Sequence, residues 1–258
     1  MKNLKNILIV LVIGIIVIAG IAMLNKDGEN EASTQNEGSK EKLIMVTEAG
    51  FAPYEFYDGE EIVGVDIEIA KKIAEKTGKE LEIKDTDFDS IINEVKTGKA
   101  DFAAAGLSIT EERLEEVDFS VEYAISKQVI VVKNENEAES IEDFNGKKVA
   151  VQLGTIADLV LSDENPEIEL VQHKKYLLAV EDLKADKVDA IVLDSLPAEE
   201  IVSKNPELKI LEKELLTDKY GIAVQKGNTE LLEDINEVLQ ELMENGKIEE
   251  YTVKYLGE

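Results

Sequence analysis

The chain has 258 residues, and its 56 acidic side chains against 28 basic ones give it a formal charge of −28. This charge argues against nucleic acid as a partner, because binding to phosphates needs a basic surface. The sequence contains no cysteine and a single histidine, His173, which excludes disulfides, thiol catalysis and metal sites built from several histidines. We therefore expect neither a metal nor another cofactor. The length suits one large domain or two of ordinary size.

An unbroken apolar run at the start of the chain covers residues 7–24 and follows two lysines. The run is long enough to cross a membrane as a helix, and the lysines favour a cytoplasmic N-terminus. Residues 1–24 are therefore predicted to be a membrane anchor. A cleaved signal sequence is the alternative, because Gly20-Ile21-Ala22 offers small residues for cleavage. Both interpretations place the following residues outside the cytoplasm, and residues 25–42 are polar enough for a flexible linker.

After the linker, apolar runs typical of strands alternate with amphipathic segments typical of helices. Residues 65–77 repeat apolar side chains on one helical face and stop at Gly78, a residue that favours the left-handed conformation after a helix. An aromatic and proline-containing loop over residues 47–56 separates the first strand from this helix. The elements predicted in this part are strands 43–46, 81–83 and 101–105 and helices 65–77 and 88–97.

The same alternation continues in the second half of the chain. Its clearest helix is residues 229–244, which keep a helical period of leucine, isoleucine and valine throughout. The other elements predicted here are strands 127–133, 148–152, 168–171, 190–193 and 220–224 and helices 140–144, 154–161, 177–185 and 196–202. Strands that alternate with helices in this way predict an α/β fold in which helices cover a sheet.

Arg113 is the only arginine in the chain, and it follows a short apolar strand that breaks at Gly106 and passes through Ser108 and Thr110. It lies in the first turn of a predicted helix, where the helix dipole favours acids over bases. A single guanidinium beside a turn of small polar residues suggests bidentate recognition of a carboxylate. The alternative is an ion pair with a nearby acid such as Glu115, Glu116 or Asp118.

Two segments of the chain resemble each other. Residues 94–106 and 182–194 each contain a helix end, a tight turn, an aspartate and a buried strand. The first strand leads to Gly106 and Arg113, whereas the second ends at Asp194. If two α/β halves face each other, the ends of these strands meet in one cleft, because ligands of open α/β sheets bind beyond the carboxyl ends of strands. A cation opposite an anion fits the zwitterion of an α-amino acid, although Asp194 could instead be a helix N-cap.

The chain resembles the extracellular solute-binding proteins of family 3, the polar amino-acid-binding subunits of ABC importers. The segments that carry this resemblance, in order along the chain, are 48–56, 63–70, 105–113, 149–155 and 188–194. The resemblance implies a two-lobed, periplasmic-binding-protein-like (type II) α/β fold with a ligand cleft between the lobes, which close by hinge motion. It also implies that residues 43–123 and 220–258 form lobe 1 and that residues 124–219 form lobe 2.

The resemblance further implies roles for individual residues. Arg113, helped by Ser108 and Thr155, would hold the α-carboxylate of the ligand, and Asp194 would take its α-ammonium group. The complete ligand-binding set implied in this chain is Glu48, Phe51, Phe88, Ala105, Gly106, Ser108, Arg113, Gln152, Thr155 and Asp194. In this set, Phe51 and Phe88 are aromatic walls along the ligand side chain, and Glu48 and Gln152 read its tip.

The position of Glu48 favours a ligand with a cationic side chain, lysine or arginine, or an amide donor such as glutamine. Two residues depart from the pattern of glutamine-binding members of the family: Ile156 stands in place of a glycine and Leu193 in place of a histidine. The expected partners are thus one of these amino acids, the permease of an ABC transporter and the membrane through the N-terminal helix. Such receptors usually act as monomers.

Other functions are compatible with such a fold. An enzyme related to dehydratases could use Glu48 and Asp194 as an acid–base pair, but neither has an obvious catalytic partner in the sequence. A sensor ectodomain would usually continue into a second membrane span. A sugar receptor is disfavoured because the chain has no tryptophan for stacking on sugar rings, and a metal receptor because it has one histidine. An amino-acid receptor that is not an enzyme remains the leading prediction.

Overall fold

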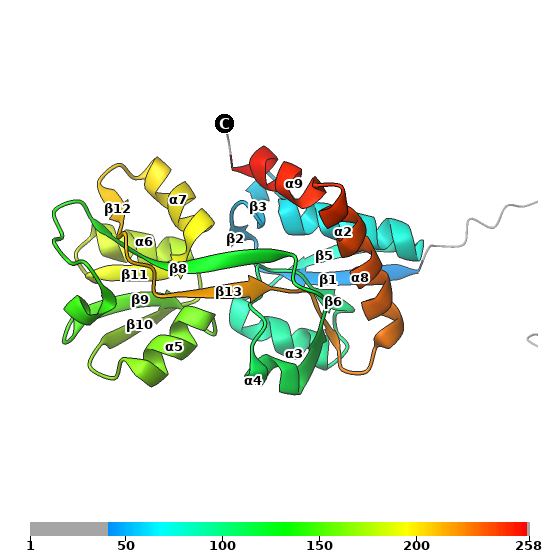
Figure 1. Ribbon diagram of the computed structural model, residues 1–258, viewed down its shortest axis with the longest axis horizontal. Coiled ribbons are helices and arrows are strands. Elements are labelled where there is room, and N and C mark those ends of the chain that lie inside the picture. The colour runs from blue at the N-terminus through cyan, green and yellow to red at the C-terminus, as the bar shows by residue number, and fades with distance from the viewer. Residues whose placement is uncertain (1–40, 257–258) are drawn as a thin grey trace, which may run out of the picture. The chain divides into compact units, whose positions relative to one another are not determined.

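The structure is a computed structural model that describes residues 41–256 (Figure 1). The predicted membrane anchor or signal sequence, residues 1–24, and nearly all of the predicted linker, residues 25–42, lie outside the described residues. Among residues 41–256, no helix combines the length and the apolar character needed to cross a membrane.

One five-stranded sheet is formed by strands from both ends of the described chain, in the order β5-β1-β6-β14-β7. Strand β1 runs parallel to β5 and β6, and β14 runs antiparallel to β6 and β7. The strands are β1 (Lys42–Thr47), β5 (Glu80–Asp85), β6 (Phe102–Ala103), β7 (Val117–Phe119) and β14 (Ala223–Gln225). A small three-stranded sheet precedes the first long helix and consists of β2 (Gly50–Phe51), β3 (Glu55–Asp58) and β4 (Glu61–Val63).

Helices cover both faces of this five-stranded sheet (Figure 1). Helix α8 packs against α2 and buries all but one of the leucine, isoleucine and valine side chains that the helical period predicted, the exception being the partly buried Leu232. Full burial of such a side chain is worth roughly 1.5–3 kcal/mol. The opposite face carries α3, whose Ile91 and Val95 are fully buried. The helical segments here are α2 (Val65–Thr77), η1 (Phe88–Ser90), α3 (Ile91–Lys96), α4 (Glu111–Glu116), α8 (Thr229–Glu244) and α9 (Lys247–Tyr255).

The second sheet has six strands in the order β10-β9-β11-β8-β12, with β13 also paired to β8. Helix α5 covers one face of it, whereas α6 and α7 cover the other (Figure 1). The strands are β8 (Ala124–Lys133), β9 (Lys148–Gln152), β10 (Glu169–His173), β11 (Ala190–Asp194), β12 (Leu208–Ile210) and β13 (Leu216–Tyr220). The helical segments are η2 (Ile141–Phe144), α5 (Ile156–Glu164), α6 (Tyr176–Lys184) and α7 (Ser195–Lys204).

The chain passes between the two sheets twice, from β7 into β8 and from β13 into β14. The two passages run side by side, and Figure 1 shows β8 and β13 as a long antiparallel pair between the sheets. The amide of Tyr123 donates a hydrogen bond of 3.0 Å to the carbonyl of Tyr220, and that of Ser120 donates one of 2.9 Å to Ile222. Two hydrogen-bonded connections therefore link the two α/β halves.

Most predicted elements are present, and α2 and α8 have the predicted bounds. The predicted strand 101–105 is too long, because only Phe102 and Ala103 pair with neighbouring strands. The predicted helix 88–97 begins as a 3-10 turn and becomes α-helical at Ile91. The segment predicted as helix 140–144 is also a short 3-10 helix, over Ile141–Phe144.

Candidate functional site

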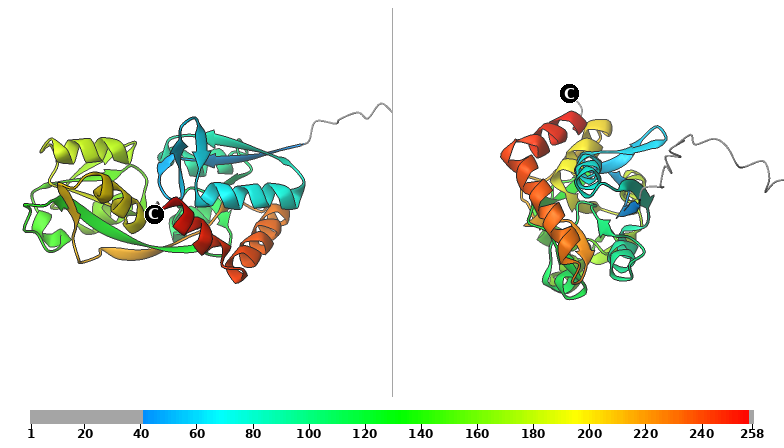
Figure 2. Two further views of the ribbon diagram at one scale, coloured as in Figure 1. Left: turned by 90° about the horizontal axis from the view of Figure 1, so that it is seen from above. Right: turned by 90° about the vertical axis from the view of Figure 1, so that its right-hand side faces the viewer.

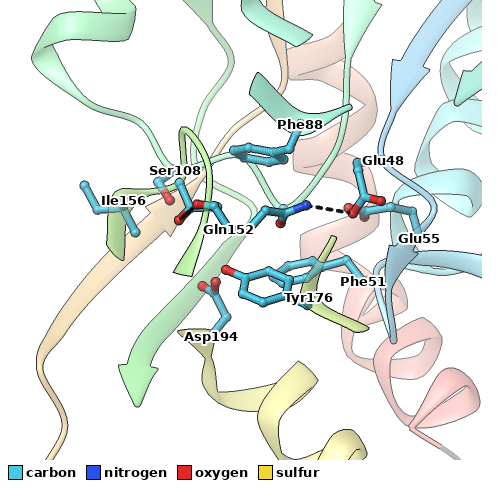
Figure 3. Close-up of a pocket in the computed structure, with 11 residues that line it drawn as sticks. Glu48, Phe51, Glu55, Phe88, Ser108, Gln152, Ile156, Tyr176 and Asp194 are labelled. Carbon is cyan, nitrogen blue, oxygen red and sulfur yellow. Dashed lines mark hydrogen bonds between the residues drawn. The ribbon is translucent and has the colours of Figure 1, made fainter. Parts of the chain in front are cut away.

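A pocket lies between the two sheets, where the carboxyl ends of their strands face each other (Figure 3). Each α/β half contributes side chains to it from strands, from loops that follow strands and from the first turns of helices. Figure 2 shows the two halves from two further directions, with the crossover strands running between them. The pocket is lined by Glu48, Phe51, Glu55, Phe88, Gly106, Ser108, Gln152, Thr155, Ile156, Tyr176 and Asp194.

Of the ten residues implied by the family resemblance, all but Ala105 and Arg113 line this pocket. Ala105 is buried in the apolar core on the α3 side of the first sheet, where it belongs to one cluster with Val46 and Ile91. The side chain of Ala105 is thus a core side chain. Arg113 lies behind Phe88, with its guanidinium carbon 5.6 Å from the centre of the phenyl ring.

The guanidinium of Arg113 is almost completely buried and extends from α4 to the other half of the molecule. Nη1 donates a hydrogen bond of 2.6 Å to the carbonyl of Ser108, and Nη2 donates one of 2.9 Å to the carbonyl of Gly154. Among residues 41–256, no carboxylate forms an ion pair with it, and burial lowers the pKa of Arg113 to about 10. The guanidinium therefore stays charged at neutral pH and lacks an anionic partner.

The alternative partners considered for Arg113 are engaged elsewhere or face away. Glu116 forms an ion pair with Lys96, and Asp118 accepts a hydrogen bond of 2.7 Å from the amide of Gly227. Glu115 is exposed and forms no ion pair with Arg113. The structure thus contradicts the prediction that Arg113 serves a local ion pair.

The turn before α5 lies next to the guanidinium. Thr155 is the N-cap of α5 and accepts a hydrogen bond of 3.4 Å from the amide of Asp158. The carboxylate of Asp158 in turn accepts one of 2.8 Å from the amide of Gly154, which adopts a positive φ of 80°. Because backbone amides and the helix dipole favour anions at a helix N-terminus, this turn and Arg113 together suit a carboxylate.

Asp194 lies on the opposite side of the pocket, at the end of β11. Its Oδ1 atom accepts hydrogen bonds of 2.7 Å from Ser126 and from Gln128, and a third one from the hydroxyl of Tyr220. None of these bonds involves Oδ2. Burial, and next the charge of Asp218, raise the pKa of Asp194 to about 6, although its three donors lower it.

Asp194 also occupies the N-cap position of α7, as the alternative interpretation of this residue required, but its side chain accepts no capping hydrogen bond. The carboxylate is instead held by side chains of β8 and β13, and it lines the pocket (Figure 3). One oxygen atom is therefore fixed by the protein, and the other can accept hydrogen bonds from a ligand.

The far end of the pocket is formed by Glu48, whose side chain is only 2% exposed. Its carboxylate forms an ion pair with the ammonium group of Lys175 and accepts a hydrogen bond of 3.3 Å from Nε2 of Gln152. The same Gln152 nitrogen donates one of 2.8 Å to the carbonyl of Lys174. Burial raises the pKa of Glu48, whereas Lys175 and Gln152 lower it.

Three pocket residues were not among those predicted from the sequence. Tyr176 stacks on Phe51 with ring centroids 5.8 Å apart, and Ile156 begins α5. Glu55 is fully buried, and no donor of the described residues reaches either of its carboxylate oxygens. A glutamate between tyrosine and phenylalanine, in an otherwise apolar loop, is a sequence signal that could have identified Glu55.

Glu55 belongs to a buried acidic pair with Asp66. Burial, and then the charge of Asp66, raise the pKa of Glu55 well above its ordinary value. Asp66 accepts a hydrogen bond of 2.9 Å from the amide of Gly106 and one of 2.8 Å from the hydroxyl of Tyr123. Asp66 thus holds the pocket loop at Gly106 against the crossover that contains Tyr123.

The chain is similar in sequence to known proteins of one family. Residues 43–258 match the family of bacterial extracellular solute-binding proteins, family 3. The arginine-binding extracellular protein ArtP of Bacillus subtilis is 32% identical over 228 residues, which are 87% of this chain and 89% of that protein.

Two solved structures share the fold. A mutant of ArgBP from T. maritima superimposes with a TM-score of 0.81 at 42% identity, covering 84% of this chain and 96% of that one. An ancestral arginine-binding protein bound to glutamine gives a TM-score of 0.79 at 41% identity, covering 84% of this chain and 98% of that one. Together with the match to the family model, these similarities show that the chain belongs to the family-3 bacterial extracellular solute-binding proteins and has their two-lobed α/β fold.

Proposed function

We propose that this protein captures a polar L-amino acid, with a basic or an amide side chain, outside the cytoplasm and delivers it to the permease of an ABC transporter. One observation carries this proposal. Among residues 41–256, a buried guanidinium that forms no ion pair lies next to the interlobe pocket, behind Phe88, and the pocket itself contains a buried carboxylate whose Oδ2 atom accepts no hydrogen bond. A free α-amino acid supplies both missing partners at once, because its carboxylate and ammonium groups are attached to one carbon.

The proposed ligand lies with its carboxylate toward Arg113, Ser108 and the N-terminal turn of α5 at Thr155. Its ammonium group meets Oδ2 of Asp194 and the backbone at Gly106. The side chain of the ligand extends along the aromatic walls toward the polar end of the pocket, which is formed by Glu48 and Gln152. Of the residues proposed from the family, Gly106 contributes only its backbone to this arrangement, and the side chain of Ala105 lies in the core.

The ligand stabilises the closed form because it bridges two lobes, which we propose to be residues 43–123 with 220–258 and residues 124–219. Without ligand, water can solvate Arg113 and Asp194 in an open cleft, whereas closure buries both charges. A zwitterionic ligand pairs both of them in the closed form and thereby shifts the population toward closure.

The location outside the cytoplasm agrees with the family, whose members are extracellular. We propose that residues 1–24 are a membrane anchor, with a cleaved signal sequence as the alternative, and that residues 25–42 tether the lobes to it. We further propose that the protein acts as a monomer. The matched relatives are named as binding proteins, which disfavours the dehydratase-like and sensor alternatives.

A thermal-shift panel of the twenty amino acids tests the proposed function. A ligand that binds only the native state raises the melting temperature, by an amount equivalent to about 2.7 kcal/mol at a concentration of one hundred times Kd. We expect arginine, lysine or glutamine to give the largest shift and the acidic and aliphatic amino acids to give none. A panel without any shift would contradict the proposal.

Binding is expected to weaken as the pH falls below about 6, because a protonated Asp194 no longer attracts the ammonium group of the ligand. The stability of the ligand-free protein responds with the opposite sign. A carboxyl pKa that is higher in the native state than in the unfolded chain favours folding at low pH, and this contribution is lost as the pH rises through about 6. Asp66, whose burial also raises its pKa to about 6, acts in the same direction.

Melting curves with and without ligand between pH 8 and pH 5 measure both effects. The shift produced by the ligand should shrink toward pH 5, while the melting temperature of the ligand-free protein should stay nearly constant from pH 8 to about pH 6 and rise from there toward pH 5. A ligand-induced shift that is the same at pH 8 and pH 5 would remove the charge of Asp194 from the binding reaction.

A further inference from the structure

Lys175 lies at the N-cap of α6, a position where the helix dipole disfavours a cation. Its ammonium group reaches across to the other lobe, pairs with Glu48 and lies 3.8 Å from Oδ1 of Asp85. The side chain of Lys175 is 36% exposed, whereas that of Glu48 is 2% exposed. A partly exposed cation thus neutralises a buried anion at the end of the pocket.

This ion pair matters for a ligand because Glu48 is the proposed reader of the side-chain tip. Apart from Lys175, the only side chain of residues 41–256 that donates a hydrogen bond to the carboxylate of Glu48 is Gln152, at 3.3 Å. A guanidinium or ammonium group that approaches Glu48 meets the positive charge of Lys175 on the same carboxylate. An uncharged amide meets no such repulsion, and it can donate to the carboxylate while Lys175 keeps its place.

We propose that Lys175 is a specificity-determining residue, an internal counterion of Glu48 that favours ligands with an uncharged amide side chain over ligands with a cationic one. This inference rests on the proposed function and names the group that decides between the two classes of amino acid. We expect a cationic ligand to bind more weakly but not to be excluded. Asp85 lies 3.8 Å from the ammonium group of Lys175 and offers it a second carboxylate when a cationic ligand pairs with Glu48.

The adjacent Lys174 provides a matched control. It also forms an ion pair between the lobes, with Asp87, but its side chain is 58% exposed and makes no contact with Glu48. Removing the charge of Lys174 therefore weakens closure without changing the charge at the end of the pocket. An effect of Lys175 that arises from closure alone should appear equally in the Lys174 variant.

The test compares the Kd values of L-arginine and L-glutamine, measured by titration calorimetry, for the wild-type protein and the Lys175→Met and Lys174→Met variants. Methionine keeps an unbranched apolar stem but removes the charge. We expect Lys175→Met to change the ratio of the two Kd values about tenfold or more in favour of arginine. Lys174→Met should change both Kd values by similar factors and leave their ratio within about twofold.

A second pair of variants shows whether Lys175 acts through Glu48. In a Glu48→Gln background, Lys175→Met should change the ratio by much less, because no carboxylate remains to be neutralised. An unchanged ratio in Lys175→Met, with binding retained, would overturn the inference but leave the proposed function intact. If the wild-type protein bound neither amino acid nor any other in the panel, the proposed function would fail and the inference with it.

Discussion

Replacing Arg113 by alanine is expected to raise the Kd for the amino acid at least about a thousandfold, which corresponds to about 4 kcal/mol. The ligand carboxylate would then be buried beside Phe88 and Ser108 without the guanidinium that neutralises it. Removal of one member of a buried charge pair typically costs 3–5 kcal/mol, because the other charge is left uncompensated. Titration calorimetry with the best ligand of the thermal-shift panel measures this loss.

The same substitution should leave the fold intact. Among residues 41–256, the guanidinium has no carboxylate partner, and it donates side-chain hydrogen bonds only to the carbonyls of Ser108 and Gly154. Its removal ends the desolvation of a buried charge but also leaves two carbonyl groups with fewer donors and creates a small cavity. These effects oppose each other, so we expect the free energy of unfolding to change by less than about 2 kcal/mol.

Two further variants separate charge from geometry. Arg113→Lys keeps the positive charge but cannot form two parallel hydrogen bonds to a carboxylate, so we expect it to recover only part of the lost affinity. Lys96→Ala removes an exposed base that is paired with Glu116 of α4, and it should leave the Kd unchanged. Binding by Arg113→Ala within about tenfold of the wild-type affinity would show that the ligand carboxylate is held elsewhere.

Site residues that carry a local sequence signal could be predicted, whereas those defined by contacts between distant parts of the chain could not. The proposed role of Arg113 came from a local pattern, because a single arginine after a turn of glycine, serine and threonine is unusual. The position of Asp194 followed from the internal repeat, which relates the ends of two strands in different lobes. Both inferences need only the sequence and the rule that ligands of α/β folds bind at the carboxyl ends of strands.

Ala105 was included in the ligand-binding set implied by the family resemblance, but its side chain lies in the core. Along residues 102–105, alternate side chains face opposite sides of the first sheet, as in any extended segment. Phe102 and Ala104 belong to the core under α2 and α8, whereas Ala103 and Ala105 belong to the core next to α3. Its neighbour Gly106 reaches the pocket because the chain turns there, with a positive φ of 51°.

Lys175 and Tyr176 could not be predicted, because their importance arises only from contacts between the lobes. In the sequence they are an unremarkable pair at the start of an amphipathic helix. Their partners, Glu48 and Phe51, lie in the loop and strand after β1, more than a hundred residues away along the chain. The arrangement of the two lobes decides which residues at the start of α6 face this loop. A local sequence pattern contains no information on that arrangement.

Asp194→Asn is expected to have the second large effect on binding, about a hundredfold or more, and it should stabilise the ligand-free protein. The three donors on Oδ1 decide how an asparagine would be oriented, because Ser126, Gln128 and Tyr220 need an acceptor at that position. The amide oxygen of asparagine therefore takes the place of Oδ1, and its NH2 group takes the place of Oδ2. This NH2 group then faces the ammonium group of the ligand, donor against donor.

The stability gain follows from the raised pKa of Asp194. Ionisation of this buried carboxyl group at neutral pH costs on the order of 2 kcal/mol relative to the unfolded chain, and asparagine does not ionise. We therefore expect a higher melting temperature without ligand at pH 8, and any residual binding should no longer weaken between pH 7 and pH 5. Asp218 provides a comparison, because its charge is, after burial, the next cause of the raised pKa of Asp194. Asp218→Asn should lower the pKa of Asp194, move the loss of binding to lower pH and keep most of the affinity at neutral pH.

If Asp194→Asn bound its ligand as tightly as the wild-type protein at pH 8, another group would have to hold the ammonium.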